Sequence, residues 1–359
     1  MTITLKILSL VVITASILPL WKTGYWWVRA LDFPRLQLMI AGLFCLVGMS
    51  LIDWNHGLDA VLVLGLLFAT GLDIYRIFPY LPFTRKESHD CQRDTQVDRL
   101  FSFISANVLI ANRQVEKLIQ LVKVNQPDLL LLLEPDDWWE KSLQVLEKDY
   151  PHHVKIPQEN TYGMLLYSRL PLQDVEIMHL VDERVPSIFT KVKLGSGDWV
   201  RFIALHPRPP RPKEGPSDER DAELMQTAKF AENKSEPIVV VGDLNDVAWS
   251  HTTRLFIRVS GMLDPRRGRG FYSTYPTKYP FFRFPLDHIF HTETLSLAAL
   301  KRLTTIGSDH FPIFVRLALT EDNRNEANEK EDGDKQDVRE MLAKGREWDG
   351  PNEKIDGEN

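Results

Sequence analysis

The first eighty residues contain three almost uncharged apolar runs, which constrain the chain more than any other feature of its sequence. The runs are ILSLVVITASILPL (7–20), LQLMIAGLFCLVGMSLI (36–52) and AVLVLGLLFATGL (60–72). The first two approach the roughly 20 apolar residues that cross a bilayer, and the third does so only if it extends to about Leu81. Aromatic residues such as Trp26 and Tyr80 flank these runs, as in interfacial belts. We predict a transmembrane region of about three helices over residues 1–83; the alternatives are a cleaved signal peptide at residues 1–20 and a buried helical subdomain.

Basic residues suggest how this region is oriented. They follow the first and third runs, as Lys22, Arg29, Arg35, Arg76, Arg85 and Lys86, whereas the second loop, DWNHG (53–57), has neither Lys nor Arg. With three spans, the first loop and everything after residue 83 share one side, and the positive-inside rule makes that side cytoplasmic. The orientation inverts if the third span is absent. Cys45 and Cys91 form no disulfide framework that would indicate an oxidising compartment.

The C-terminal segment 321–359 has a different composition. It carries fourteen acidic and seven basic residues, a net charge of −7, whereas the whole chain carries −6. The body of the protein is therefore nearly neutral. Because EDNRNEANEKEDGDKQD has no apolar periodicity, we predict a solvated, disordered tail with at most a short helix near VREMLAKG (338–345).

The middle segment, residues 95–320, alternates between strand-like and helix-like stretches. LFSFISANV (100–108) and DLLLLLE (128–134) read as strands separated by the helix-like NRQVEKLIQLVKVN (112–125). Many further strands and few helices follow, some with the spacing of hairpins. This pattern predicts a layered α/β or α+β sandwich in which helices cover two sheets.

Polar side chains stand where these apolar strands end. IVVVGDLND (238–246) is a buried strand that ends in Gly242 and is followed by carboxylate and amide groups. The same pattern recurs at Asn107, Glu134, His206, Asp243, Asn245, Asp287, His288, Asp309 and His310. Each of these residues taken singly has a simple structural explanation, such as a helix cap or a hydrogen-bonded histidine in the core. These explanations do not account for the recurrence of polar residues at so many strand ends. Carboxylate and amide oxygens are the ligands that Mg²⁺ prefers, together with water and substrate phosphate.

The chain resembles the endonuclease/exonuclease/phosphatase superfamily over about residues 98–318. The resemblance rests on an ordered set of motifs: SANV, LLLLLEP, YGMLLYSRLP, ALHPRPP, VVGDLND, LDHIF and GSDHFPI. It implies a four-layered α/β sandwich, here preceded by the transmembrane helices. It also implies hydrolysis of phosphoester bonds with Mg²⁺ or Mn²⁺. The three short spans before such a domain resemble bacterial inner-membrane members of the superfamily.

The resemblance also assigns roles to individual residues. It implies that Glu134, Asn107 and Asp309 bind the metal. His310 would contact the scissile phosphate, with Asp287 holding its imidazole. Asp243 would orient or deprotonate the attacking water. Asn245 would donate a hydrogen bond to a phosphoryl oxygen, and His206 would contact the phosphate.

The identity of the substrate is less constrained. Two groups of basic residues, Arg208, Arg211 and Lys213, and Arg266, Arg267, Arg269 and Arg283, are expected to flank the metal. They suit a nucleic-acid backbone, a lipid headgroup or plain solvation. The aromatic GFYSTYPTKYPFF (270–282) suits base stacking or contact with lipid. We favour a membrane-anchored nuclease-type phosphodiesterase; the alternatives are a phospholipid or inositol-phosphate hydrolase and a catalytically inactive binding module.

Overall fold

The computed structural model describes residues 2–52, 57–92, 94–212, 215–232, 234–320 and 325–347. The strands in these ranges are β1 Leu100–Asn107, β2 Leu129–Leu133, β3 His152–Ile156, β4 Met164–Ser168, β5 Leu172–Met178, β6 Ser187–Lys193, β7 Trp199–Leu205, β8 Ile238–Asp243, β9 Asp287–His291, β10 Leu295–Arg302 and β11 Ile313–Leu319. The α-helices are α1 Thr2–Ile17, α2 Trp26–Arg29, α3 Arg35–Ser50, α4 Gly57–Ile77, α5 Val115–Asn125, α6 Asp137–Ser142, α7 Asp218–Ala231, α8 His251–Ser260 and α9 Asp334–Arg346.

The strands form two mixed sheets. One has the order β10-β11-β1-β2-β4-β3 and the other β5-β6-β7-β8-β9. Only β1–β2 and β7–β8 are parallel pairs among the described strands, and each of these pairs contributes a strand end to the candidate site below.

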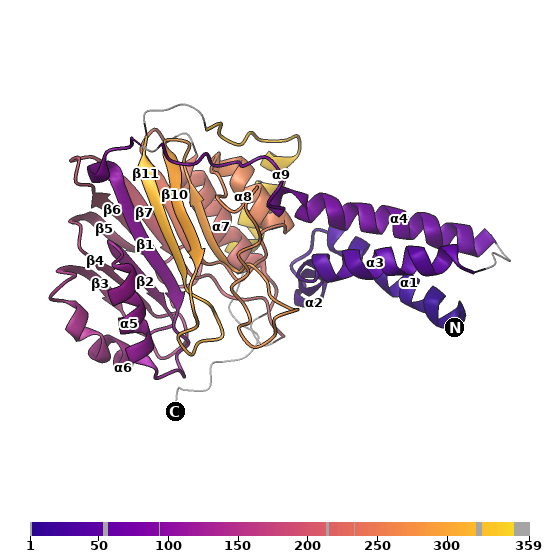
Figure 1. Cartoon of the computed structure of the whole chain (residues 1–359), viewed down its shortest axis with the longest axis horizontal. Helices are drawn as coiled ribbons and strands as arrows, with labels where there is room; N and C mark the ends of the chain where they lie inside the picture. The colour runs from indigo at the N-terminus through magenta and orange to yellow at the C-terminus, as the bar shows by residue number, and fades with distance from the viewer. Residues whose placement is uncertain are drawn as a thin grey trace.

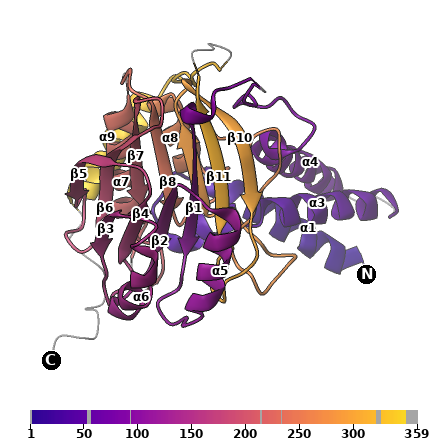
Figure 2. The ribbon, with the colours of Figure 1, turned by 60° about the vertical axis from the view of Figure 1, so that its left-hand side comes forward.

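The sheets pack face to face over an apolar core. Side chains of both sheets share this core, and Phe103 of β1 meets Phe202 of β7 edge to face with the ring centroids 5.4 Å apart. The outer face of the first sheet packs on α5 and α6, and that of the second packs on α7 and α8 (Figures 1 and 2). The predicted four-layered sandwich is confirmed.

The N-terminal helices α1, α3 and α4 pack together as a bundle that projects from the sandwich (Figure 1). Two are long and apolar enough to cross a membrane: Thr2–Leu20, with a mean hydropathy of 2.2, and Gly57–Tyr80, with 1.8. The second predicted span differs, because α3 has 16 residues and reaches spanning length only with Trp26–Asp32, to which it is bent by 69°. Most of the predicted loop 53–57 lies outside the described residues.

The bundle is joined to the sandwich through buried contacts. Trp249 donates its indole N–H to the carbonyl of Asp32 at 2.7 Å, and the Tyr80 hydroxyl donates to the carbonyl of Ala248 at 2.7 Å. Both ends of the N-terminal region therefore contact the segment that follows β8. This arrangement puts the loop after α1 and the sandwich at the same end of the bundle.

Part of the C-terminal segment is also packed on the sandwich. Helix α9 lies against α7, with Val338 buried and Met341 and Leu342 partly buried in the adjoining core. Residues 334–346 thus form a docked helix, in contrast to the largely solvated tail expected from the sequence. Val338, Met341 and Leu342 form a narrow apolar stripe on the helix. The segment is so highly charged that its composition alone does not indicate a packed helix. Residues 321–324 and 348–359 lie outside the described ranges.

Candidate active site

Four strand ends converge at one edge of the sandwich. Asn107 ends β1, and Glu134 follows β2, which runs parallel to β1. Asp243 ends β8 and pairs with Asp287 at the start of the antiparallel strand β9. The amide Nδ2 of Asn107 lies 3.3 Å from Oδ2 of Asp243. Residues from the two sheets therefore meet at one place.

Gly242 allows the end of β8 to approach the neighbouring strand β7 closely at this edge of the sandwich. Its φ is 152°, and a Cβ atom at this position would lie 1.8 Å from the carbonyl oxygen of Leu205 on the neighbouring strand β7. Only glycine fits such an approach without displacing the backbone. The residue next to it, Asp243, is consequently held at a fixed position at the rim.

Glu134 also has an unusual backbone conformation. Its φ is +63°, and its N–H donates to the carbonyl of Gly163 at 3.0 Å. Its carboxylate accepts a hydrogen bond from Nδ2 of Asn107 at 2.7 Å, yet burial raises the pKa of Glu134. Left-handed conformations of residues other than glycine tend to occur at functional sites. The side chain keeps 16% of its surface exposed and so remains accessible to a ligand.

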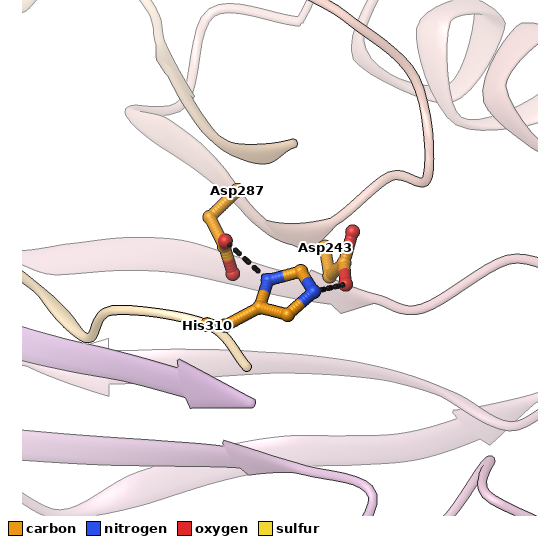
Figure 3. Close-up of side chains that lie close together, drawn as sticks. All are labelled: Asp243, Asp287 and His310. Carbon is orange, nitrogen blue, oxygen red and sulfur yellow. Dashed lines mark hydrogen bonds and ion pairs between the residues drawn. The ribbon is translucent and has the colours of Figure 1, made fainter. Parts of the chain in front are cut away.

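His310 lies between two carboxylates (Figure 3). Its Nδ1 is 2.9 Å from Oδ2 of Asp287, and its Nε2 is 3.4 Å from Oδ2 of Asp243. Burial opposes protonation, but the two carboxylates outweigh it and raise the pKa of His310 to about 10. Because both ring nitrogens face carboxylate oxygens, the imidazole is held as a cation at neutral pH.

The other predicted residues lie around this centre. Burial lowers the pKa of His206, whose Nε2 is 4.0 Å from Oε1 of Glu134, so this imidazole is neutral. Nδ2 of Asn245 donates to the carbonyl of Pro207 at 2.9 Å, which leaves its second N–H available. The carboxylate of Asp309 accepts a hydrogen bond from Oγ of Ser308 at 3.3 Å.

A cavity of about 520 Å³ connects these groups to the surface. Glu134, Asp243, Asn245, Asp309 and His310 line its polar side. Its other side is apolar. Tyr275 and Phe282 come from the aromatic segment 270–282 that the sequence had indicated for substrate contact. The sequence interpretation did not assign the other apolar lining residues to the site, namely Trp26, Ala30, Phe33, Pro34, Pro209, Pro210, Phe284 and Leu286. Trp26 through Pro34 come from the N-terminal region. No local pattern indicates this, because they meet the site only through tertiary packing.

Most of the predicted basic residues do not face the cavity as free charges. Arg208 is buried and pairs with Asp182 at 2.6 Å. Three members of the second group are also engaged: Arg266 pairs with Asp264, Arg267 with Glu87 and Arg269 with Asp90. The fourth, Arg283, donates to the carbonyl of Thr277 at 2.9 Å. Arg211 lines the cavity, and Lys213 lies outside the described residues. Of the two predicted basic groups, Arg211 alone among the described residues lines the cavity.

The polar side of the cavity suits a divalent cation. Among the residues that the structure describes, Asp243, Asp287 and His310 bring possible ligand atoms within 4.8 Å of one another, but a protonated imidazole has no lone pair to offer a metal. Glu134 and Asp309 carry the carboxylate oxygens that hard cations prefer. The amide oxygen Oδ1 of Asn107 accepts the N–H of Leu109 at 3.0 Å, and its Nδ2 faces Glu134. Burial already raises the pKa of Glu134, and the neighbouring charge of Asp309 acts in the same direction. A cation beside these carboxylates would relieve the repulsion between their negative charges.

Comparison with known proteins gives one family and a shared fold. Residues 104–310 match the model of the Endonuclease/Exonuclease/phosphatase family. The structure is similar to D. rerio TDP2 complexed with a single-strand DNA product, with a TM-score of 0.50, 18% identity, and coverage of 61% of this chain and 98% of that one. It is also similar to the human Nocturnin catalytic domain with bound sulfate, with a TM-score of 0.51, 16% identity, and coverage of 67% and 100%.

A bacterial structure resembles the chain to the same degree. An endonuclease/exonuclease/phosphatase family protein from Bacteroides thetaiotaomicron has a TM-score of 0.50 and 16% identity, with coverage of 62% of this chain and 96% of that one. No curated protein sequence matches the chain. At these identities, the structural likenesses establish the sandwich fold of the C-terminal part.

Proposed function

The chain belongs to the endonuclease/exonuclease/phosphatase family, and from this membership we propose that it is a membrane-anchored, divalent-metal-dependent phosphodiesterase. The main support is that His310 lies between Asp243 and Asp287 beside a cavity that also receives Glu134 and Asp309. A phosphodiester is an anion that repels hydroxide, so its hydrolysis needs positive charge near the phosphoryl oxygens and a base for water. The cavity offers groups suited to both tasks.

Glu134, Asn107 and Asp309 are proposed to hold Mg²⁺ or Mn²⁺. When bound, the ion would neutralise charge that develops on the phosphoryl oxygens. The neutral His206 near Glu134 and the second N–H of Asn245 are proposed to contact the remaining phosphate oxygens.

Asp243 is proposed to orient the attacking water and accept its proton. Burial raises the pKa of Asp243, which makes it a stronger base than an exposed aspartate. His310 contributes a cation to the phosphate side, and Asp287 fixes its ring through the bond to Nδ1. Because burial is outweighed by the charge of His310 and by this hydrogen bond, the pKa of Asp287 is lowered and Asp287 stays ionised.

Two substrate classes fit this reaction. The sequence favours a nuclease-type enzyme, and the DNA product that D. rerio TDP2 holds in the same fold supports that choice. A lipid phosphodiester is the second candidate, supported by the apolar wall that Trp26, Phe33 and Pro34 add to the cavity.

The location proposed for the enzyme is the bacterial inner membrane, with the sandwich in the cytoplasm. The two long apolar helices support membrane anchoring. With the bent pair Trp26–Asp32 and Arg35–Ser50 as a third crossing, the basic residues after α1 and α4 support the orientation.

The test uses the full chain in detergent micelles with Mg²⁺ and the soluble diester bis(4-nitrophenyl) phosphate. Replacing Glu134 with Gln keeps the shape but removes the charge, and we expect kcat/KM to fall by about 10²–10³-fold, because metal neutralisation contributes several kcal/mol. The matched control is Asp137→Asn, an exposed acid at the start of α6. Turnover that survives both EDTA and E134Q would overturn the proposal.

A further inference from the structure

A second hollow, of about 1040 Å³, lies beside the catalytic cavity. It is a groove between the helices α1 and α3 and the loop 269–283. Its apolar lining includes Leu8, Ile40 and Phe44 from the helices and Phe271, Phe281 and Phe282 from the loop. Phe281 is 84% exposed and Phe44 is 69% exposed. Side chains this apolar and this exposed are expected to lie in lipid rather than in water.

The groove runs toward the catalytic cavity along α3. Phe282 lines both hollows, and Leu36 of the groove is separated by only one residue from Pro34 of the cavity. Gln37 holds the loop against α3 by donating from Nε2 to the carbonyl of Phe281 at 2.7 Å. An extended chain lying along Ile40 and Leu36 therefore reaches the cavity beside Phe282.

Two arginines give the groove a positive rim. The guanidinium carbons of Arg283 and Arg302 lie 4.8 Å and 4.6 Å from the ring centroid of Phe311. Arg283 donates to the carbonyl of Thr277 at 2.9 Å, and Arg302 donates to that of Ser273 at 2.8 Å. Among the described residues neither forms an ion pair with a carboxylate, unlike Arg266, Arg267 and Arg269 of the same loop. Two neighbouring cations without a counter-ion favour an anionic ligand.

We propose that this groove is the hydrocarbon-chain subsite of the active site, and that the substrate is an anionic phospholipid drawn from the membrane. The inference rests on the phosphodiesterase activity proposed above and names its substrate class. The acyl chains lie along α3, and the phosphodiester enters the cavity past Phe282. Arg283 and Arg302 favour lipids with a net negative charge over zwitterionic ones, because a quaternary ammonium group would be repelled.

The reaction at this site is hydrolysis. The oxygen of a water molecule forms a bond to phosphorus while one ester P–O bond breaks. The water proton passes to Asp243, and the leaving alkoxide takes up a proton from bulk water. The products are an alcohol and a phosphomonoester, and no electrons are gained or lost.

The same observations disfavour a nucleic acid. A polynucleotide would need a track of free basic residues, whereas most of those predicted beside the site are committed to carboxylates within the chain. The wall opposite the catalytic residues is apolar and belongs to the region that carries the predicted membrane spans.

The experiment fills the groove and leaves the catalytic residues intact. Ala41 lines the groove on α3, and Ala41→Trp would occupy the space of the chain. Val47, also on α3 and 61% exposed, does not line the groove, so Val47→Trp is the matched control. The full-length variants are assayed in mixed micelles with dioleoyl phosphatidylglycerol, dioleoyl phosphatidylcholine, bis(4-nitrophenyl) phosphate and single-stranded DNA.

We expect the wild type to cleave phosphatidylglycerol in preference to phosphatidylcholine and DNA. A41W should lower kcat/KM for the lipid at least about tenfold more than for the soluble diester, since a blocked apolar pocket typically costs about one to two orders of magnitude. V47W should leave both values unchanged, and Arg302→Gln should reduce the preference for phosphatidylglycerol.

The outcomes separate this inference from the proposed function. Cleavage of the soluble diester or DNA without cleavage of either lipid would overturn the lipid subsite and keep the phosphodiesterase. Equal losses on both substrates in A41W would also overturn it. If no diester is hydrolysed at all, the proposed function itself fails.

Discussion

Oδ2 of Asp287 lies 2.9 Å from Nδ1 of His310, on the side of the ring opposite Asp243. Because the two carboxylates raise the pKa of His310 to about 10 against the effect of burial, its cationic form persists below that pH. A rate that depends on this cation should hold through neutral pH and fall only as the pH rises toward about 10.

Replacing Asp287 with Asn removes one of the charges that raise this pKa. The alkaline limb of the kcat profile should then move to lower pH, into the range of about pH 7–9, since the reference pKa of histidine is about 6.5. The measurement is hydrolysis of bis(4-nitrophenyl) phosphate across pH 6–10. Asp149→Asn, at an exposed acid remote from His310, is the control. An unmoved limb in D287N would show that this pair does not set the pH dependence.

The sequence predicts residues of the site that follow directly from strand ends. Asn107 and Glu134 come after neighbouring parallel strands, so alternation of apolar runs and polar ends is enough to place them together. The same reasoning placed Asp243 and Asp287 at one rim, and the register of β8 and β9 pairs them directly. His310 enters from the loop before β11, where its motif, not periodicity, identified it.

Features that depend on packing between distant segments could not be predicted in this way. Trp26 and Phe33 reach a cavity whose polar residues lie over a hundred positions away, and no local pattern records this contact. The charges of Arg208 and Arg266 were visible in the sequence, but their buried partners were not. Counting basic residues therefore overestimated the positive surface beside the site.

Gly242 gives a second prediction. Gly242→Ala would put a Cβ atom 1.8 Å from the carbonyl oxygen of Leu205, at a φ of 152°. We expect the free energy of unfolding to fall by at least about 3 kcal/mol, because the β7–β8 pair must separate. Gly197→Ala is the control: its φ is 94°, but nothing lies within 4 Å of the added atom. Thermal unfolding in detergent measures both, and equal losses would show that backbone strain, not the clash with Leu205, dominates.

Arg29 gives a third prediction, on the joint between the N-terminal region and the sandwich. Its buried guanidinium donates to Oγ1 of Thr252 at 2.6 Å and lies 3.4 Å from Asp246 and 3.6 Å from Asp221. Arg29→Leu leaves these buried carboxylates with less positive charge, which typically costs about 3–5 kcal/mol. We expect a large decrease in the unfolding temperature.

The matched control for Arg29 is an ion pair of the N-terminal region whose basic member is exposed. Lys22 bonds to Asp337 at 2.7 Å, but 56% of its side chain is exposed, and such pairs contribute about 0–1 kcal/mol. Lys22→Ala should therefore leave the melting temperature nearly unchanged. Similar melting temperatures for R29L and K22A would contradict the importance assigned to the buried network.

The last prediction concerns Glu223, a buried acid on α7. Burial raises its pKa to about 7, and the charge of Asp182 acts in the same direction. These two effects outweigh the hydrogen bond that Oε1 accepts from Oγ of Ser187 at 2.9 Å. The folded protein thus binds this proton more tightly than the unfolded chain, where the pKa is about 4.5. The stability it contributes is present below about pH 4.5 and lost as the pH rises through about 7.

Replacing Glu223 with Gln supplies a neutral side chain of similar shape at every pH. The melting temperature of the wild type should therefore fall more between pH 5 and pH 8 than that of E223Q, by an amount equivalent to about 1–3 kcal/mol. Glu340→Gln, at an exposed position of α9, should keep the slope of the wild type. Parallel slopes for wild type and E223Q would mean that another buried group releases the proton over this range.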